Sequence, residues 1–413
     1  MGNKYINLIS VVLILLAFTN CTNYRTMNEE EVIKQLYKKY YPNESSVSKV
    51  RYDMDDDENH VISVTIENAS DLTEFPEELL AFKKLEQITI RDCNIEEIPE
   101  FITEFDSLKI LTVYGNPVKE IPEFIVNCKN LKQLDVENTE VSVLPDFLEE
   151  IDLIGIYIKG SQITGFPKVL YKFKDLRILT ISNDELPSDI GSFKLKVLCA
   201  ELKSFKYIDQ LEKLIELDLS NSTAKYLPEN FGNLQKLEDL NLANCKNLVK
   251  LPHSIGNINR FWGITLSGCS RLTALPSSMN KIHIGALDLN RCYNLKSVPK
   301  GMMVGAITAR ETKWKAMPSG IFYSTCHNLD VTDHQITDIT GIGNMYNLNI
   351  LNLSRGNIQK IPDGIGRLKE LSILIMEHND IKVIPRALDN CLKLKGVRLY
   401  GNPVYDMEAL EVF

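Results

Sequence analysis

The side chains that could carry out chemistry in this chain are nine cysteines, six histidines and one acidic run. The histidines form neither a His-Glu-x-x-His motif nor a zinc pattern with the cysteines. The acidic run at residues 53–58 could bind calcium, but Glu58 stands where an EF-hand loop needs glycine, and Val64 where it needs a bidentate glutamate. A solvated turn before a strand explains the run better. Because no serine elbow, phosphate loop or fixed-spacing carboxylate pair is present, we predict no enzyme, no cofactor and no metal site.

A repeat positions the remaining polar side chains. Thirteen of the 16 prolines directly follow a large apolar residue, mostly at intervals of 23 residues. One unit reads Leu108-x-x-Leu111-x-Val113-x-x-Asn116-x-Val118-x-x-Ile121-Pro122-x-x-Ile125-x-x-Cys128. We count 16 such rungs, the first starting at Val61 and the last at Leu394. The pattern resembles that of leucine-rich repeats over about residues 61–404.

Each rung should contain one strand and one turn. In LxxLxL, alternate residues point to the same side of a strand, so the leucines face the core and the x residues face outward. The later L-P-x-x-I has a spacing of three, which suits a short helical turn. Neither element buries its apolar side alone, so the coils must stack. We therefore predict an α/β solenoid, with a parallel sheet on one face and short helical or 3-10 turns on the other. The resemblance to leucine-rich repeats implies a horseshoe with the sheet on its concave face.

Most cysteines fit structural positions of the repeat. Seven occupy the asparagine position after the strand, an apolar position of the convex turn or the first leucine position of a rung: Cys93, Cys245, Cys269, Cys292, Cys128, Cys391 and Cys326. Adjacent rungs would place Cys245, Cys269 and Cys292 about 5 Å apart, so one pair could form a disulfide, although we favour buried thiols. Cys199 alone has an outward position, which predicts an exposed, reactive thiol.

The outward residues are where a ligand could bind. The residue at the centre of each LxL is often threonine, aspartate or asparagine: Thr65, Thr89, Thr112, Asp135, Tyr157, Thr180, Cys199, Asp218, Asn241, Thr265, Asp288, Thr308, Asp330, Asn352, Ile375 and Arg398. Such a face could bind a polar or basic surface, and aromatic residues are enriched at interfaces. The candidate ligand-binding residues are Tyr114, Tyr157, Asp218, Trp262, Asp288 and Asp330. A strand face exposed to water also needs polar residues, which explains the same column without any ligand.

The repeat departs from its period in two places. From Val304 to Cys326 the convex turn changes, with Trp314 in the coil. Between Leu176 and Leu214 the rungs are only 19 residues apart, and no Leu-Pro pair marks the second of them. Short coils alter local twist and could mark a binding bend, although degenerate repeats are the commoner cause.

The N-terminus indicates export. Residues 1–20 contain one lysine and an apolar run too short for a bilayer, as in a signal peptide. The sequence up to Cys21 resembles a bacterial lipoprotein signal, which implies lipidation of Cys21. Residues 21–60 are polar. Asn28 could cap a helix there whose Val32, Ile33 and Leu36 close the first rung. Residues 405–413 are predicted to be a C-terminal tail.

These features predict a non-catalytic interaction scaffold, which is held at the bacterial cell envelope by a lipid and is periplasmic or surface-exposed. It would bind a protein or a glycan through the concave face. The net charge of −9 argues against nucleic acid, and we expect a monomer. One alternative is a soluble exported or cytosolic interaction module. A remote alternative is an enzyme with a site in the irregular coils near Cys199.

Overall fold

The computed structural model describes residues 28–41, 50–57 and 59–404. These residues belong to two compact units, unit 1 (1–182) and unit 2 (183–413). The predicted signal peptide, Cys21 and the predicted tail at 405–413 lie outside the described residues.

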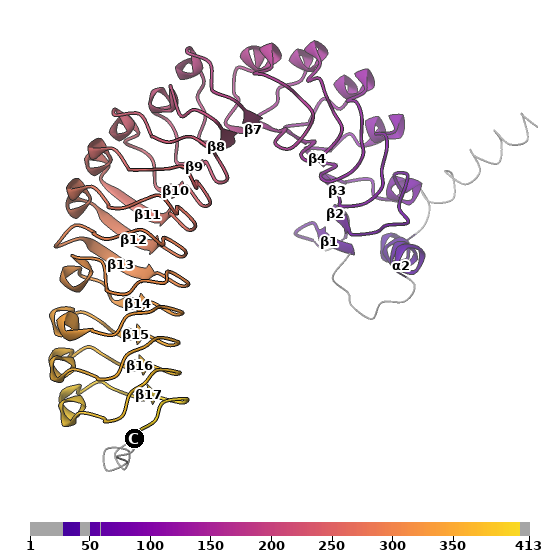
Figure 1. The fold of residues 1–413 in the computed structure, drawn as a ribbon. Coiled ribbons are helices and arrows are strands. Elements are labelled where there is room, and N and C mark those ends of the chain that lie inside the picture. The colour runs from indigo at the N-terminus through magenta and orange to yellow at the C-terminus, as the bar shows by residue number, and fades with distance from the viewer. Residues whose placement is uncertain (1–27, 42–49, 58, 405–413) are drawn as a thin grey trace, which may run out of the picture. The chain divides into compact units, whose positions relative to one another are not determined.

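Unit 1 contains a sheet of parallel strands with one antiparallel strand at its start (Figure 1). The strands are β1 (Val50–Met54), β2 (Val61–Glu67), β3 (Gln87–Arg91), β4 (Ile110–Thr112), β5 (Gln133–Asp135), β6 (Gly155–Tyr157) and β7 (Ile178–Asn183). Each pairs with the next in sequence, and the pairing of β2 to β7 is parallel.

The other side of unit 1 carries one 3-10 turn per coil. The turns are η1 (Glu77–Ala81), η2 (Glu100–Glu104), η3 (Glu123–Asn127), η4 (Asp146–Glu150) and η5 (Lys168–Lys172). A proline precedes each turn with a φ between −63° and −81°, which the first residues of a helical turn require. The repeated proline therefore starts the turn, as its spacing predicts.

Helix α2 (Glu29–Tyr40) and strand β1 cover the open side of β2. Asn28 caps the helix by accepting a hydrogen bond from the Glu30 N–H at 2.9 Å, and Val32, Ile33 and Leu36 are buried. Strand β1 is an element that the sequence does not predict, because its residues alternate weakly. Its antiparallel pairing places Arg51 opposite Thr65.

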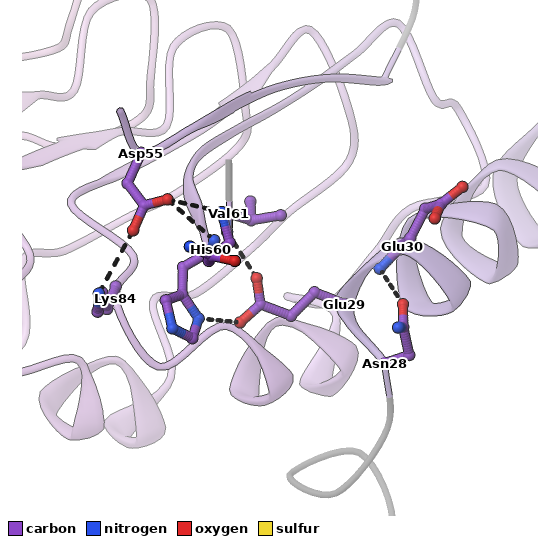
Figure 2. A network of polar contacts seen from close by, with 8 residues as sticks. Asn28, Glu29, Glu30, Asp55, His60, Val61 and Lys84 are labelled. Carbon is purple, nitrogen blue, oxygen red and sulfur yellow. Dashed lines mark hydrogen bonds and ion pairs between the residues drawn. The ribbon is translucent and has the colours of Figure 1, made fainter. Parts of the chain in front are cut away.

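The described part of the acidic run lies at the end of β1 and in the turn that follows it (Figure 2). Asp55 Oδ1 accepts the N–H groups of Asn59 and His60, at 2.8 and 3.1 Å, and Lys84 approaches its Oδ2 at 3.3 Å. Glu29 at the start of α2 accepts the Val61 N–H at 2.6 Å. The carboxylates therefore shape the turn and join the helix to the first parallel strand.

Unit 2 repeats the same coil. Its strands are β8 (Val197–Leu202), β9 (Glu216–Asp218), β10 (Asp239–Asn241), β11 (Arg260–Thr265), β12 (His283–Asp288), β13 (Met303–Thr308), β14 (Asn328–Asp330), β15 (Ile350–Asn352), β16 (Ile373–Ile375) and β17 (Gly396–Arg398). All of them pair in parallel with their neighbours in sequence.

The 3-10 turns of unit 2 lie on the side away from its strands (Figure 1). They are η6 (Ile190–Ser192), η7 (Ile208–Gln210), η8 (Phe231–Asn233), η9 (His253–Asn257), η10 (Ser277–Lys281), η11 (Ile321–Tyr323), η12 (Thr340–Asn344), η13 (Asp363–Arg367) and η14 (Arg386–Asn390). In both units the structure confirms the predicted fold class, a repeat solenoid with parallel strands on one face and 3-10 turns on the other.

Buried polar side chains join successive coils. The Asn116 amide donates to the carbonyls of Ile90 and Val113, at 3.0 and 3.1 Å, and accepts the Ile95 N–H at 3.1 Å. Each of these bonds satisfies a backbone group that the turning chain would otherwise leave buried and unpaired.

Three cysteines take the asparagine position in unit 2. The thiols of Cys245, Cys269 and Cys292 each donate to a carbonyl of the preceding coil at 3.1 Å. Burial raises the pKa of Cys245 and Cys292 to about 12, so both remain thiols at neutral pH. These three residues are thus small buried hydrogen-bond donors.

His334 fills another asparagine position. Its Nδ1 accepts the Ile336 N–H at 3.0 Å and its Nε2 lies 3.3 Å from the Leu353 carbonyl, which fits a neutral ring. Burial lowers the pKa of His334. Gly356 makes room for this ring, because a Cβ there would lie 2.0 Å from His334 Cε1.

No helix among the described residues is both long and apolar enough to cross a lipid bilayer.

Candidate functional site

The strand face of unit 1 presents three columns of outward side chains. Parallel register aligns Thr65, Thr89, Thr112, Asp135, Tyr157 and Thr180 in the central column. Because side chains alternate along a strand, residues two positions before and after each of these also face outward.

A depression of about 380 Å³ lies on this face, and we call it the polar hollow. Its lining residues come from β1 to β6: Arg51, Thr65, Gln87, Thr89, Arg91, Ile110, Thr112, Gln133, Asp135 and Tyr157. The short threonine side chains leave space between longer ones. Thr89 and Thr112 are only 7% exposed, so they lie at the bottom of the hollow.

Tyr157 leans along its own strand. Its hydroxyl donates to Gln133 Oε1 at 3.0 Å. Gly155 permits this position, because a Cβ there would lie 3.1 Å from Tyr157 Cε2 and 3.2 Å from Gln133 Cγ. Burial raises the pKa of Tyr157, and Asp135 adds to the effect. The phenol therefore stays protonated and closes one end of the hollow.

Asp135 is the buried carboxyl of the polar hollow. It is 9% exposed, and its Oδ1 accepts the Glu137 N–H at 2.9 Å. Burial raises its pKa to about 7, although the hydrogen bond from the Glu137 N–H and the charge of Arg91 act in the opposite direction. Near neutral pH this carboxyl can therefore donate a hydrogen bond as an acid or accept one as an anion.

Two arginines supply positive charge to the hollow. The Arg91 guanidinium stacks on the Tyr114 ring at 4.8 Å, and its Nε is buried without a hydrogen-bond partner. Arg51 pairs with Glu67 at 3.0 Å. An unpaired buried N–H is unfavourable, so a ligand acceptor reaching Arg91 would gain a strong hydrogen bond.

The structure therefore places the predicted residues of unit 1 in different roles. Tyr157 lines the polar hollow, whereas Tyr114 supports Arg91 beside it. Sequence reasoning missed Arg51, Arg91, Gln87 and Gln133, because it followed only the central column. Reading the two flanking columns at the same period would have found Arg91, Gln87 and Gln133.

In unit 2 the predicted aspartates bond to their own sheet. Asp218 Oδ1 accepts the Ser220 N–H at 2.7 Å and its Oδ2 accepts the Asn241 amide at 2.9 Å. Asp288 Oδ1 accepts the Asn290 N–H at 2.8 Å. Each carboxylate thus accepts the backbone N–H two residues further along the chain and stabilises the turn at the end of its own strand.

The Asp330 carboxylate is held in place by hydrogen bonds, two of them from a charged guanidinium. The Arg310 guanidinium donates to its Oδ2 at 2.7 and 3.0 Å, and the Thr332 hydroxyl donates to its Oδ1 at 2.6 Å. Both carboxylate oxygens therefore have partners.

Trp262 is the prominent aromatic residue of this face, at 57% exposed. Its indole N–H donates to Glu238 at 3.0 Å, and the Arg260 guanidinium stacks on its ring at 4.3 Å. Arg260 also pairs with Glu238 at 3.1 Å. These contacts hold the ring in place on the strand face.

Cys199 is half-buried in β8, and not exposed as the sequence predicts. Its short side chain lies beside Asp218 in the sheet register, between the longer Val197 and Glu201 of its own strand. In the described part of the chain, histidine, cysteine and carboxylate side chains form no group of three that could hold a metal ion.

Coils with one strand, an asparagine or cysteine after it and a 3-10 turn opposite resemble those of leucine-rich-repeat proteins. A sequence model of the Leucine Rich Repeat matches residues 236–258. No curated protein matches the chain in sequence.

A solved structure supports the same fold. The chain is similar to a leucine-rich-repeat protein of Leptospira interrogans, with 21% identity, a TM-score of 0.54, and coverage of 82% of this chain and 84% of that one. It also matches the leucine-rich-repeat ectodomain of the Arabidopsis thaliana receptor kinase GASSHO1/SCHENGEN3, with 20% identity, a TM-score of 0.46, and coverage of 87% and 49%. An internalin of Listeria monocytogenes matches with 17% identity, a TM-score of 0.39, and coverage of 81% and 85%. At 21% identity the likeness to the Leptospira protein concerns the fold alone.

Proposed function

We propose that this protein is a non-catalytic binding scaffold of the bacterial cell envelope, which engages a protein or a glycan through the strand face of unit 1. Leucine-rich-repeat folds generally mediate protein–protein interaction, which supports a binding role. The observation that carries the proposal is the polar hollow, where Asp135 and Arg91 keep hydrogen-bonding capacity that their own sheet does not use.

The chemistry of the hollow suits a polar ligand group. Arg51 and Arg91 can bind a carboxylate or another anion, and Asp135 can bind a hydroxyl, an amide or an amine. Ile110 is the one aliphatic side chain among the lining residues, so an apolar ligand group would leave most of these polar atoms unpaired. Hydroxyl-bearing sugars and polar side chains of a protein both meet this requirement.

Photo-crosslinking tests where the partner binds. A photoreactive residue replacing Gln87 in the hollow should give adducts in envelope preparations, and the same residue replacing Lys382 in unit 2 should not. Adding Tyr157→Ala should reduce the adducts at position 87 at least tenfold. Equal adducts at both positions, or adducts unaffected by Tyr157→Ala, would exclude the hollow as the binding site. Probing a glycan array with the wild type and Asp135→Asn identifies a sugar ligand, if there is one.

The envelope location rests on residues 1–21 of the sequence. We propose that Cys21 is lipidated and that the lipid anchors both units to a membrane. Cys21→Ala should move the protein from the membrane pellet to the soluble fraction, and mass spectrometry of the mature N-terminus should find an acylated cysteine. A variant that stays in the pellet would contradict the anchor without affecting the binding proposal.

A further inference from the structure

The shortened coil of unit 2 leaves a notch that is lined by residues outside the strand face. Residues 195–213 form this coil, which runs from β8 through η7 (Figure 1). It lacks the stretch with the Leu-Pro pair that the following coil has at Leu227 and Pro228. Tyr207 takes a left-handed φ of 67°, which bulky residues rarely adopt, so the chain turns sharply to close the short coil.

A notch of about 740 Å³ lies where the missing stretch would have packed. Two continuous runs line it, residues 203–206 of the short coil and residues 223–229 of the next one, together with Lys250. We call it the lysine notch. Phe205, Ala224 and Leu227 are at most 3% exposed and form its floor.

One wall of the lysine notch is a piece of backbone with strand geometry. Tyr226 forms a parallel bridge with Lys250 of the next coil, and the Val249 N–H donates to the Lys225 carbonyl at 3.1 Å. Toward the short coil, the Thr223 N–H donates to the Leu202 carbonyl at 2.9 Å. Among the described residues, the short coil supplies no bridge partner for Tyr226. The segment 225–227 therefore faces the notch with one edge open to a further strand.

The notch is basic on an acidic protein. Lys203, Lys206, Lys225 and Lys250 line it, with Glu229 as the only acidic lining residue, whereas the whole chain has a net charge of −9. Three of these lysines pair with exposed carboxylates, at 2.8, 4.0 and 3.6 Å. Such exposed pairs contribute little, so a competing anion can replace them. Lys225 has no ion pair within the described residues.

An exposed aromatic ring completes the surface. Tyr226 is 53% exposed, and the Lys250 ammonium lies 6.0 Å from its ring centre. The ring and the lysine stems give an apolar contact area bordered by positive charge, which suits a segment that alternates acidic and apolar side chains.

We propose that the lysine notch binds an extended, acidic peptide segment of a partner protein, which adds as a strand beside Lys225–Leu227. Backbone hydrogen bonds to the open edge would provide affinity, and the four lysines would select carboxylate side chains. The partner's apolar residues would pack on Tyr226 and the floor. The site is separate from the polar hollow and does not depend on its function.

A defined peptide tests the proposal. The probe is a fluorescein-labelled heptapeptide in which glutamate alternates with isoleucine, titrated against the whole mature protein by fluorescence polarisation. Saturable binding is expected, weakened at least tenfold by Lys225→Glu combined with Lys250→Glu and about as much by Tyr226→Ala. Lys382→Glu, an exposed lysine of unit 2 outside the notch, should leave the affinity unchanged. Thermal melting of each variant shows that it is folded.

Two further probes separate strand addition from simple charge attraction. The same heptapeptide with alternate backbone nitrogens methylated should bind at least tenfold more weakly, because methylation removes the donors that a strand pair needs. Inorganic polyphosphate of similar charge should compete poorly. The proposal is overturned if the methylated peptide binds as well as the unmethylated one, if polyphosphate displaces it at equal charge, or if Lys382→Glu weakens binding as much as the notch variants do.

Discussion

Asp135 in unit 1 and Asp330 in unit 2 occupy the same outward column of the repeat, yet their surroundings differ. Asp330 receives two hydrogen bonds from Arg310 and one from Thr332. Asp135 has one backbone N–H and, among the described residues, no ion pair, and burial raises its pKa to about 7. The repeat thus determines where a carboxyl points, whereas residues of the neighbouring rungs determine its charge and what it can bind.

The two strand faces also differ in the space beside their glycines. A glycine substitution in unit 2 should give the largest change in the free energy of unfolding. A Cβ on Gly285 in unit 2 would lie 2.5 Å from the Trp262 backbone oxygen. Gly285→Ala should therefore force β11 and β12 apart and lower the free energy of unfolding by about 2 kcal/mol or more. Urea unfolding of the whole protein measures this change. An unchanged midpoint would show that the strands can shift freely there.

Asp135→Asn should have the next largest effect, with the opposite sign. The pKa of Asp135 in the folded protein is about 7, above the ordinary 3.8, so its contribution to stability is full below pH 3.8 and is lost as the pH rises through 7. The neutral amide avoids that loss. The variant should be more stable than the wild type at pH 8, where the wild-type carboxyl is ionised, and equal to it at pH 3.5. A pH-independent difference between the two proteins would contradict the buried-acid assignment.

Asp330→Asn should destabilise the protein modestly. It removes the carboxylate that Arg310 grips, but the Arg310 side chain is 57% exposed and water can take the place of its partner. We expect a loss of about 0.5–1 kcal/mol at pH 7. Urea unfolding of Asp330→Asn and Asp135→Asn under the same conditions checks the comparison. The two substitutions lie in the same outward column, yet they should shift the unfolding midpoint in opposite directions.

Gly155→Ala should have the smallest effect on stability. The three atoms nearest to its Cβ would belong to the side chains of Tyr157 and Gln133, which can move. We expect a cost below about 1 kcal/mol, together with displacement of the Tyr157 ring and weaker binding of any ligand of the polar hollow. Unfolding and crosslinking from position 87 measure the two effects. If both stay at wild-type values, Gly155 does not position Tyr157.

Much of the fold could be predicted, because a period of about 23 residues specifies strand, turn and core together. The helix after Asn28 was also predictable from its cap, its charges and its apolar face. Strand β1 was not, because Val50–Met54 is mostly polar and is recognised only by its partner β2. The polar hollow escaped prediction for a related reason. It is formed by the central column and both flanking columns of outward side chains, by the space beside Gly155, and by Arg51 of β1. Only the folded sheet brings these parts together.

The cap formed by α2 and β1 also bears on self-association. A solenoid that ended at β2 would expose a row of backbone groups matching its own next rung, which is the geometry by which identical chains add end to end. Strand β1 occupies those groups in the antiparallel direction, and its Arg51, Tyr52 and Asp53 are exposed. A second copy that offers parallel rungs meets a strand of the opposite direction at this end. The N-terminal cap therefore acts as a terminator that disfavours growth of filaments from this end of the repeat.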